Sequence, residues 1–414
     1  MTKKSDAPAI RFKGFSDAWE QRKLGDIADI VGGGTPSTGN QSYWDGDIDW
    51  YAPAEIADQI YANSSQKKIT GLGYENSSAK MLPPGTVLFT SRAGIGKTAI
   101  LTRKGCTNQG FQSIVPHRGE LDSYFIFSRT EELKRYGELV GAGSTFVEVS
   151  GKQMAVMELM MPPTMREQQT IGGFFQQLDH LITLHQRKFE KLTNVKKSML
   201  EKMFPQNGSS YPEIRFKGFT DPWEQRKLGD MMNVTSVKRI HQSDWTDSGV
   251  RFLRARDIVA AAKNEEPDDY LYISKEKYEE YSTLSGKVGV SDLLVTGVGT
   301  IGVPYLVRNL EPLYFKDGNI IWFQNSDKID GKFLFYSFSA EQIQGFINES
   351  AGIGTVGTYT IESGKKTPIS LPNQIEQAKV GEFFQQLDNL ITLHQRELEK
   401  LQNIKKSMLE KMFV

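Results

Sequence analysis

Apolar residues recur at alternating intervals of four and three in two long stretches of the chain. In the first stretch, 174–204, the repeated positions are Leu178, Ile182, His185, Phe189, Leu192, Met199 and Met203. In the second, 383–413, they are Leu387, Ile391, His394, Leu398, Leu401, Met408 and Met412. This spacing between charged flanks is the a/d stripe of a coiled coil, and it predicts two long helices. Lys196 and Lys405 interrupt the stripe at the same place in both copies.

We expect these two helices to pack on each other. The first should end before Pro205 and the polar linker 206–210. Each helix alone would expose an apolar stripe, so the simplest arrangement is an antiparallel pair with a pseudo-two-fold axis. At 1.5 Å per residue, such a helix extends about 45 Å, against about 34–36 Å for one turn of duplex DNA. His185 and His394 are expected to pack as interface histidines, because a shared metal would lack further ligands at suitable spacing.

Before each long stretch the pattern changes to short runs. TVLFT, QSIVP, GTYTI and NIIWFQ are typical of strands, whereas SYFIFSRTEELKRYGEL and GKFLFYSFSAEQIQGFI are typical of helices. This mixture predicts an α/β (α+β) fold rich in turns. We predict two such domains at 1–160 and 211–370, with helical spacers at 161–210 and 371–414.

The chain is a tandem duplication. IRFKGFSDAWEQRKLGD (10–26) and IRFKGFTDPWEQRKLGD (214–230) differ at two positions, and the long stretches agree at 26 of 31. The intervening regions share only a skeleton: DWYAPAEI (49–56) matches RFLRARDI (251–258), LFTSRAGIGK (88–97) matches LVTGVGTIGV (294–303), and GSTFVEVSGK (143–152) matches GTVGTYTIESGK (354–365).

The contrast between the two kinds of segment indicates their roles. Nearly identical segments are expected to build a frame or to bind two copies of one partner, whereas divergent segments suit two separate specificities. If the frame is symmetric, 10–26 should pack beside the second helix as 214–230 packs beside the first.

Composition restricts the class of protein. The 414 residues suit two or three domains, and a single cysteine, Cys106, cannot form an internal disulfide or a cysteine-based metal cluster. No apolar run approaches the length of a membrane span, and the N-terminal lysines precede no apolar signal-peptide core, which predicts a cytoplasmic protein. Lys+Arg equals Asp+Glu. A stand-alone nucleic-acid binder usually has a basic excess, so neutrality suggests that affinity depends on partners.

Motifs that resemble catalytic signatures are incomplete. AGIGKT (93–98) resembles a P-loop, but Ser91 stands where the first glycine is required, and GTIGVP in the second repeat lacks the Lys-Thr pair. GGGTPSTG does not follow the dinucleotide-binding fingerprint, and MPPT and LPPG lack the residues that flank Pro-Pro in amino-methyltransferases. We therefore predict a binding protein that is not an enzyme, with no catalytic residue, metal or cofactor of its own.

Over essentially its whole length the chain resembles the DNA specificity subunits of type I restriction–modification systems. The resemblance rests on the tandem order, the WEQRKLGD openings at Trp19 and Trp223, the T-x4-I-G strands at 90–96 and 296–302, and the LEKMF helix ends. It rests also on GSTFVEVSGKQM and GTVGTYTIESGK.

This resemblance implies two target-recognition domains, each reading one half of a split DNA site, with the helices as a molecular ruler. It implies two modification (methyltransferase) subunits docked on the helices, joined by restriction (translocase–nuclease) subunits, which methylate adenine or cleave DNA. S-adenosylmethionine, ATP and Mg²⁺ would belong to those partners.

Candidate contact residues follow from side-chain chemistry. Arg suits guanine, Asn and Gln suit adenine, and Ser, Thr and backbone N–H groups suit phosphate. The DNA-contact candidates are Ser91, Arg92, Lys97, Asn108, Gln109 and Gln112 in the first domain, and Lys238, Arg239, Arg254, Arg256, Thr300, Asn319, Thr355 and Tyr359 in the second. Partner docking is predicted on the outward helix faces, including Arg187, Lys197, Arg396 and Lys406. The alternatives are a coiled-coil scaffold that binds protein but no DNA, and an enzyme, either a P-loop ATPase or a fused methyltransferase.

Overall fold

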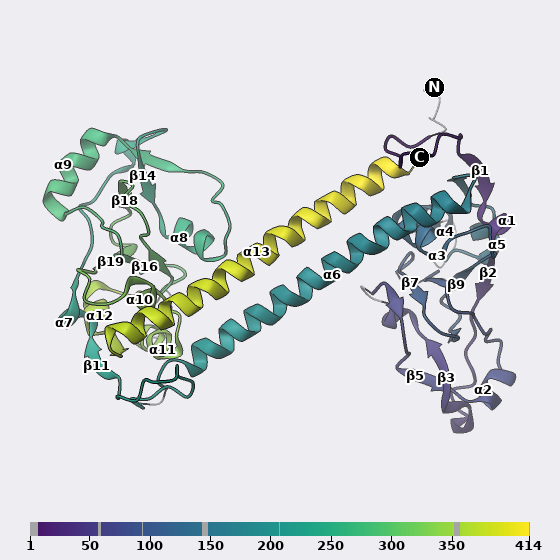
Figure 1. Ribbon diagram of the computed structural model, residues 1–414, viewed down its shortest axis with the longest axis horizontal. Helices are drawn as coiled ribbons and strands as arrows, with labels where there is room; N and C mark the ends of the chain where they lie inside the picture. Colours follow the sequence, from purple (N-terminus) through teal and green to yellow (C-terminus); the bar gives the residue numbers. More distant parts are fainter. Residues whose placement is uncertain are drawn as a thin grey trace. The chain divides into compact units, whose positions relative to one another are not determined.

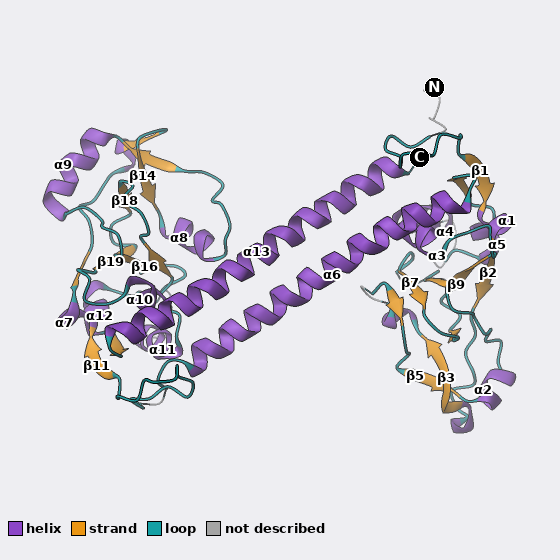
Figure 2. Cartoon of the chain, in the orientation of Figure 1, coloured by secondary structure: helices purple, strands orange, loops and turns teal. Residues whose placement is uncertain are grey.

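The computed structural model describes residues 7–56, 59–92, 94–142, 148–206, 208–351 and 357–413. The chain forms two compact units. Unit 1 consists of 1–184 with 398–414, and unit 2 of 185–397. Each unit therefore holds one mixed helix–sheet domain and parts of two long helices, as the ribbon views show (Figures 1 and 2). The mixed class, the two tandem domains and the long helices are confirmed, while the four domain boundaries remain predictions.

Within its described residues, the domain of unit 1 contains three small sheets, with strand orders β1-β10, β2-β9-β6-β7-β4 and β5-β3-β8. Their strands are β1 (Glu20–Lys23), β2 (Ala28–Gly32), β3 (Trp44–Tyr51), β4 (Tyr61–Ala62), β5 (Lys67–Ile69), β6 (Val87–Phe89), β7 (Thr98–Leu101), β8 (Cys106–Thr107), β9 (Gln112–Pro116) and β10 (Glu158–Met161). The helices are α1 (Leu24–Ile27), α2 (Gly71–Glu75), α3 (Ser123–Ser128), α4 (Thr130–Gly141) and α5 (Gly151–Ala155), with short 3-10 turns η1 (Gln41–Tyr43) and η2 (Pro53–Glu55). The predicted strands TVLFT and QSIVP are confirmed as β6 and β9.

The domain of unit 2 repeats this plan, with strand orders β11-β20, β12-β19-β16-β17 and β13-β15-β14-β18. Its strands are β11 (Glu224–Lys227), β12 (Asn233–Thr235), β13 (Trp245–Thr246), β14 (Val250–Leu253), β15 (Leu271–Ile273), β16 (Leu293–Thr296), β17 (Pro304–Leu306), β18 (Leu313–Phe315), β19 (Ile320–Gln324) and β20 (Pro368–Leu371). Its helices are α7 (Leu228–Met231), α8 (Ala255–Ala262), α9 (Lys275–Ser285), α10 (Gly331–Ser337), α11 (Glu341–Ser350) and α12 (Ile361–Lys366), with the 3-10 turn η3 (Gln242–Asp244).

Two predictions about local structure need correction. GTYTI is not a strand, because Thr360 caps α12 by accepting a hydrogen bond from the N–H of Ser363 at 3.1 Å. The long helices, α6 (Met165–Lys202) and α13 (Gln374–Met412), begin nine residues earlier than the predicted stretches. Their early turns carry no regular stripe, because they pack on the domain of their own repeat as well as on the facing helix.

The two long helices are antiparallel in each unit (Figure 1). In unit 1, Asp179 of α6 pairs with Lys405 of α13. In unit 2, His185 of α6 contacts His394 of α13, and Lys196 of α6 contacts Asp388 of α13. Residue numbers therefore increase along α6 in the direction in which they decrease along α13. The predicted antiparallel pairing is confirmed.

The chain that follows each long helix places a phenylalanine, Phe204 after α6 and Phe413 after α13, in the apolar core of the other repeat's domain. We call these two side chains the aromatic plugs. Phe413 packs in unit 1 with its ring 5.8 Å from Phe175 and 6.4 Å from Trp19. Phe204 packs in unit 2, with its ring 5.9 Å from Phe384 and 6.0 Å from Trp223. The plugs bring large aromatic surfaces out of water, the main favourable contribution to this packing.

The short opening blocks pack on the helix ends in the same way in both units. The N–H of Ile10 donates to the carbonyl of Lys411 at 2.9 Å, and the N–H of Ile214 donates to that of Lys202 at 2.9 Å. The symmetric packing of 10–26 and 214–230 is therefore confirmed.

Candidate nucleic-acid interface and helix docking faces

The T-x4-I-G segments form the same turn in both domains. In unit 1 the hydroxyl of Thr90 donates to the carbonyl of Gly94 at 2.7 Å and accepts from the N–H of Lys97 at 2.9 Å. The hydroxyl of Thr296 makes the equivalent bonds in unit 2, at 2.5 and 2.9 Å. Each turn joins two antiparallel strands, β6 to β7 and β16 to β17. It is a hairpin loop, whereas a P-loop leads from a strand into a helix.

Two further segments dock on each turn. The N–H of Val149 donates to the carbonyl of Ser91 at 3.0 Å, and the N–H of Tyr359 donates to that of Gly297 at 2.9 Å. Gly297 in turn donates to the carbonyl of Asn319 at 2.8 Å. The fold therefore gathers three loops in each domain: the hairpin turn, the loop before β9 or β19, and the chain that leads into α5 or α12.

In unit 1 these loops expose a small polar cluster, which we call the Arg92 cluster: Thr35, Arg92, Gln109 and Glu148. The Arg92 guanidinium donates to the carbonyl of Gln109 at 2.6 Å and lies 3.6 Å from a carboxylate oxygen of Glu148. The hydroxyl of Thr35 donates to the side-chain oxygen of Gln109. Because the Arg92 side chain is 40% exposed, it retains donors that face solvent.

The triple glycine at 32–34 explains how the strand end approaches this cluster. A Cβ on Gly33 would lie 1.9 Å from the carbonyl oxygen of Asn108 and 2.4 Å from that of Thr107. Only glycine allows the backbone to pass so close. The glycines therefore serve packing that places Thr35 beside Gln109.

The other candidates of unit 1 lie in different settings. Ser91 is buried, and among the described residues its hydroxyl has no hydrogen-bond partner. Asn108 turns its side-chain oxygen back to the N–H of Gly110 at 2.8 Å. Lys97 is exposed, and it lines a cavity of about 630 Å³. Gln112 is half-buried on β9. The structure thus brings together Arg92 and Gln109, whereas Lys97 lines a cavity beside α4.

In unit 2 two candidate arginines are held by carboxylates. Arg254, which is only 16% exposed, pairs with Asp257 and with Asp269, each at 2.9 Å. Arg256 also pairs with Asp269 and is more exposed. The guanidinium of Arg254 therefore fixes the start of α8, and Arg256 is the more accessible of the two.

Two basic candidates lie in the loop between β12 and η3 of the same domain. The Lys238 ammonium lies 4.5 Å from the ring centre of Tyr281, and Arg239 lies 3.5 Å from a carboxylate oxygen of Asp317. Both side chains are exposed. They remain available for a phosphate contact, since Arg239 is 69% exposed and its pairing at that distance is weak.

The remaining candidates divide between surface and core. Thr300 is exposed at the hairpin tip, and Asn319 is half-buried beside it. Tyr359 is 2% exposed, with its hydroxyl 2.5 Å from that of Thr367. It therefore packs in the domain core, where burial raises its pKa. Thr355 lies outside the described residues.

Sequence reasoning missed a basic cluster on the three-stranded sheet of unit 1. Lys68 and Arg103 both pair with the buried carboxylate of Asp49, each at 2.8 Å. Burial opposes ionisation of Asp49, but hydrogen bonds from Lys68 and Ser65 outweigh it, and the pKa of Asp49 is lowered. Lys67 and Lys104 are exposed next to them in sequence. The runs QKK and TRKG carry this signal.

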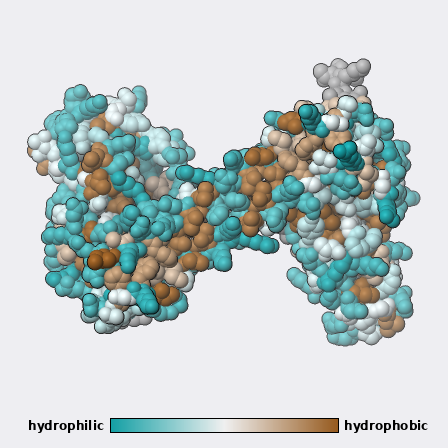
Figure 3. All heavy atoms as spheres, viewed as in Figure 1, coloured by the Kyte–Doolittle hydropathy of each residue, from teal (hydrophilic) through white to brown (hydrophobic). Residues whose placement is uncertain are grey.

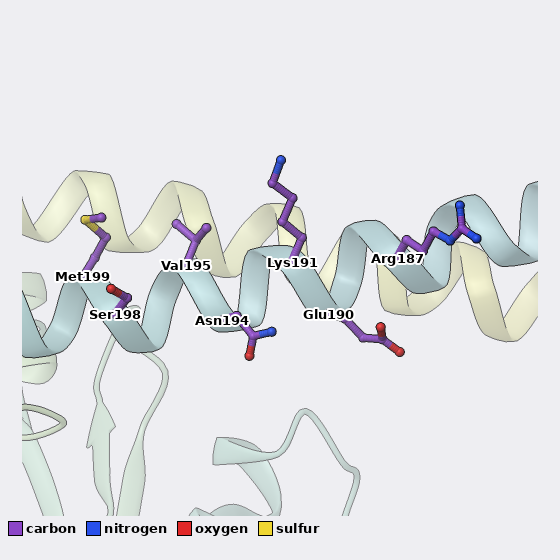
Figure 4. Close-up of a pocket in the computed structure, with 7 residues that line it drawn as sticks. All are labelled: Arg187, Glu190, Lys191, Asn194, Val195, Ser198 and Met199. Carbon is purple, nitrogen blue, oxygen red and sulfur yellow. The ribbon is translucent and has the colours of Figure 1, made fainter. Parts of the chain in front are cut away.

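A seven-residue face of α6 forms a shallow groove at the surface (Figure 4). Its residues are Arg187, Glu190, Lys191, Asn194, Val195, Ser198 and Met199. The positions 209 residues later are Arg396, Glu399, Lys400, Asn403, Ile404, Ser407 and Met408, identical except for Val195 and Ile404. The chain therefore carries the same polar and apolar pattern on both long helices. Of the predicted docking residues, Arg187 lies in this groove, and Lys197, Arg396 and Lys406 are exposed on the helices.

Exposed leucines accompany this pattern. Leu181 and Leu184 of α6 are 41% and 38% exposed, and the matching Leu390 and Leu393 of α13 are 44% and 52% exposed. Apolar side chains can be seen at the surface of both long helices (Figure 3). Paired exposed leucines at a spacing of three residues form a small apolar strip on a helix, which is typical of a protein-binding surface.

The paired histidines face each other, as predicted. Their Nδ1 atoms are 3.1 Å apart and their rings meet edge to face. One ring must donate and the other accept, so at least one of the two imidazoles must be neutral. Burial, His185 and Lys188 lower the pKa of His394. The described residues contain no group of three or more side chains suited to hold a metal ion.

One family model, described as the type I restriction modification DNA specificity domain, matches residues 16–194 and again 220–403. The chain belongs to this family.

Relatives in the specificity family differ in how much of the chain they match. The MjaIX specificity subunit of Methanocaldococcus jannaschii is 31% identical over 261 residues, 60% of each chain. The MjaVIII specificity subunit of the same organism is 23% identical over 409 residues, covering 94% of this chain and 91% of the relative. The EcoR124I/EcoR124II specificity subunit of Escherichia coli is 26% identical over 170 residues, 39% of this chain and 41% of the relative.

A solved structure has the same fold. The S subunit of a type I restriction–modification system from M. genitalium superimposes with a TM-score of 0.62 at 13% identity, covering 99% of both chains. DNA recognition follows from membership of the specificity family. Among the described residues, no helix is long and apolar enough to cross a membrane.

Proposed function

We propose that the chain recognises a split, asymmetric DNA site, with one half-site read by each domain. The observation that carries this proposal is that one frame is built twice around unlike loops. Arg92 in the first hairpin turn corresponds to Val298 in the second, because Thr90 and Thr296 make the same bonds. Two domains with the same scaffold and different exposed donors would prefer different base sequences.

The Arg92 cluster is the proposed reading surface of the first domain. Its exposed donors and acceptors suit base edges, while Lys67, Lys104 and Arg103 supply positive charge for phosphates. In the second domain, Lys238, Arg239 and Arg256 are the candidates whose cationic side chains are accessible. Arg256 would exchange its carboxylate partner for a phosphate when DNA binds.

The duplicated helix faces are the proposed docking sites for two copies of a methyltransferase subunit. Identical patterns at Arg187–Met199 and Arg396–Met408, with exposed leucines alongside, suit one protein surface used twice. Restriction subunits would join that complex, which would act on cytoplasmic DNA. S-adenosylmethionine, ATP and Mg²⁺ would be bound by those partners, and the target adenine would be flipped into the methyltransferase.

The helix pair is the proposed ruler between the half-sites. Its α6 contains 38 residues, which corresponds to about 57 Å at 1.5 Å per residue. A rigid spacer of this kind would accept one gap length only. Insertion of one helical turn in α6 and in α13 is expected to change the gap without changing either half-site.

Methylation mapping tests this proposal. The chain is expressed with its methyltransferase partner in a bacterium without DNA methylation, and methylated adenines are mapped across the genome. The expected result is a split motif of two unlike half-sites with one fixed gap, lost when the chain is omitted. If both proteins are soluble and bound to each other but the complex neither methylates nor binds DNA, the chain is a protein scaffold instead.

A further inference from the structure

The long helices hold each recognition domain through a repeated face. In unit 1 this face of α6 carries Gln168 and Gly172. The side-chain oxygen of Gln168 accepts from the N–H of Asp122 at 3.0 Å, and a Cβ on Gly172 would lie 2.6 Å from the Asp122 carboxylate. The first turn of α3 therefore lies directly on α6.

About two turns after Gly172, Asp179 joins three elements in unit 1. One oxygen of its carboxylate accepts from the hydroxyl of Tyr124 on α3 at 2.8 Å. The other lies 2.6 Å from the ammonium of Lys405 on α13. Asp179 is 5% exposed and Tyr124 7%, so the contacts are largely shielded from water.

Unit 2 contains the same arrangement with the helices exchanged. Asp388 of α13 accepts from the hydroxyl of Tyr336 on α10 at 2.7 Å. Its second oxygen lies 2.6 Å from the ammonium of Lys196 on α6. Lys196 and Lys405 are the residues that interrupt the apolar stripe, so these triads account for both interruptions.

The two tyrosines come from non-equivalent positions. Asp122 and Asp330 both cap their helices by accepting from the third N–H, at 2.8 and 2.9 Å. Tyr124 lies two residues after its cap, whereas Tyr336 lies six residues after its own. The difference of four residues is about one helical turn on the same side. Two domains that differ in sequence thus contact equivalent aspartates, Asp179 and Asp388, through tyrosines at different positions, which indicates that the contact itself is required.

We propose that each Tyr–Asp–Lys triad is a positioning group that locks a recognition domain to the helix pair and so fixes the gap between half-sites. The inference rests on the proposed function. One aspartate binds the domain through one oxygen and the opposite helix through the other, so the domain cannot turn without loosening the helix pair. The lysine that secures each domain is supplied by the other repeat.

The test uses the full chain in complex with its methyltransferase and a library of DNA sites with three gap lengths. The wild type is expected to methylate one gap. Tyr124→Phe, Lys405→Met, Tyr336→Phe and Lys196→Met are each expected to raise methylation of gaps one base pair longer or shorter by about fivefold to tenfold relative to the preferred gap, as expected for the net loss of one hydrogen bond.

Double variants test which lysine secures which domain. Tyr124→Phe with Lys405→Met removes two parts of one triad, and its effect on gap selectivity should be smaller than the product of the single effects. Tyr124→Phe with Lys196→Met affects two triads, and the effects should multiply. The opposite pattern would overturn the assignment of lysines across repeats.

Tyr136→Phe is the matched control, because the Tyr136 hydroxyl donates to the carbonyl of Gln153 within the same domain and belongs to neither triad. It should keep the wild-type gap preference, as should the conservative Lys405→Arg. If the triad variants lower methylation of all gaps in the same proportion, the triads are merely structural and the inference is wrong. A wild type that methylates no split site would instead refute the proposed function.

Discussion

Unit 1 and unit 2 agree closely where the opening block meets the long helix of its own repeat, and they differ where the loops face solvent. Arg11 meets Glu167 at 2.6 Å and Arg215 meets Glu376 at 2.7 Å, both bidentate. The loops above this frame carry Arg92 in one unit and Val298 in the other. Sequence identity in this chain therefore marks contacts that both repeats make, and divergence marks the surface that is free to vary.

The frame itself contains one difference. The indole N–H of Trp19 donates to Glu167 at 3.3 Å, whereas that of Trp223 is buried with no partner among the described residues. We call the contact of each opening block with Glu167 or Glu376 of the long helix a junction. The junction in unit 1 therefore contains one more hydrogen bond than the junction in unit 2.

The largest expected effect comes from the junction glutamates. Glu167→Ala should lower the free energy of unfolding by about 4 kcal/mol and Glu376→Ala by about 3 kcal/mol, because each leaves a largely buried arginine unpaired and only the first also releases a tryptophan. Urea unfolding followed by tryptophan fluorescence measures both. Glu213→Ala, at an exposed pair with Lys202, is the control and should change little. Equal losses at Glu167 and Glu376 would contradict the role of Trp19.

The aromatic plugs come next. Phe204→Ala should cost about 3 kcal/mol, because the side chain is 4% exposed among three aromatic rings. Phe413→Ala should cost about 2 kcal/mol, because Phe413 is half-buried. Thermal unfolding of the two variants gives the order. A larger loss at Phe413 would show that its contact with the Arg129 guanidinium, 5.4 Å from the ring centre, outweighs the difference in burial.

A smaller effect is expected at the loops. Arg92→Ala should weaken binding of the methyltransferase complex to its site by about tenfold, the loss typical of one base or phosphate contact. Arg135→Ala removes the same charge from exposed α4 and should leave binding unchanged. Binding is measured by fluorescence anisotropy at fixed salt. Equal weakening by both variants would mean that Arg92 acts only through overall charge.

The smallest effect concerns pH. Because the pKa of His394 is lowered in the folded chain, the unfolded chain binds more protons as pH falls below about 6.5. The contribution of the histidine pair is therefore present above that pH and is lost as pH falls through the folded pKa. The melting temperature of the wild type should fall between pH 7.5 and 5.5 more than that of His394→Leu. Parallel curves for the two proteins would refute this account.

The frame was predictable because its signals are periodic or repeated. The stripe from Leu178 to Met203 predicted α6, and the paired blocks predicted that Ile10 and Ile214 would occupy equivalent places. The junction glutamates were missed, although Glu-Gln recurs at 167–168 and 376–377, because their arginine partners lie far away in sequence. No periodic pattern reports a contact of that kind.

The candidate site was less predictable, since loop composition does not reveal which side chains face inward. Ser91 and Tyr359 were chosen for their chemistry but are buried, and Arg254 is held by two carboxylates. The sequence match between the Ser-Gly-Lys triplets at 150–152 and 363–365 also gave a wrong structural correspondence. Ser150 caps α5, whereas the cap of α12 is Thr360 and Ser363 lies within that helix. Hydrogen bonding, not residue identity, sets the true correspondence.

The plug at Met412 and Phe413 has a consequence for synthesis of the chain. The domain of unit 1 includes residues made early by the ribosome, yet its aromatic core is incomplete until residue 413 has been added. A truncated product that lacks Met412 and Phe413 would expose apolar core side chains of the domain in unit 1. Proteases and chaperones would recognise that exposed surface, so the first domain would be protected from them only once the second repeat had been synthesised.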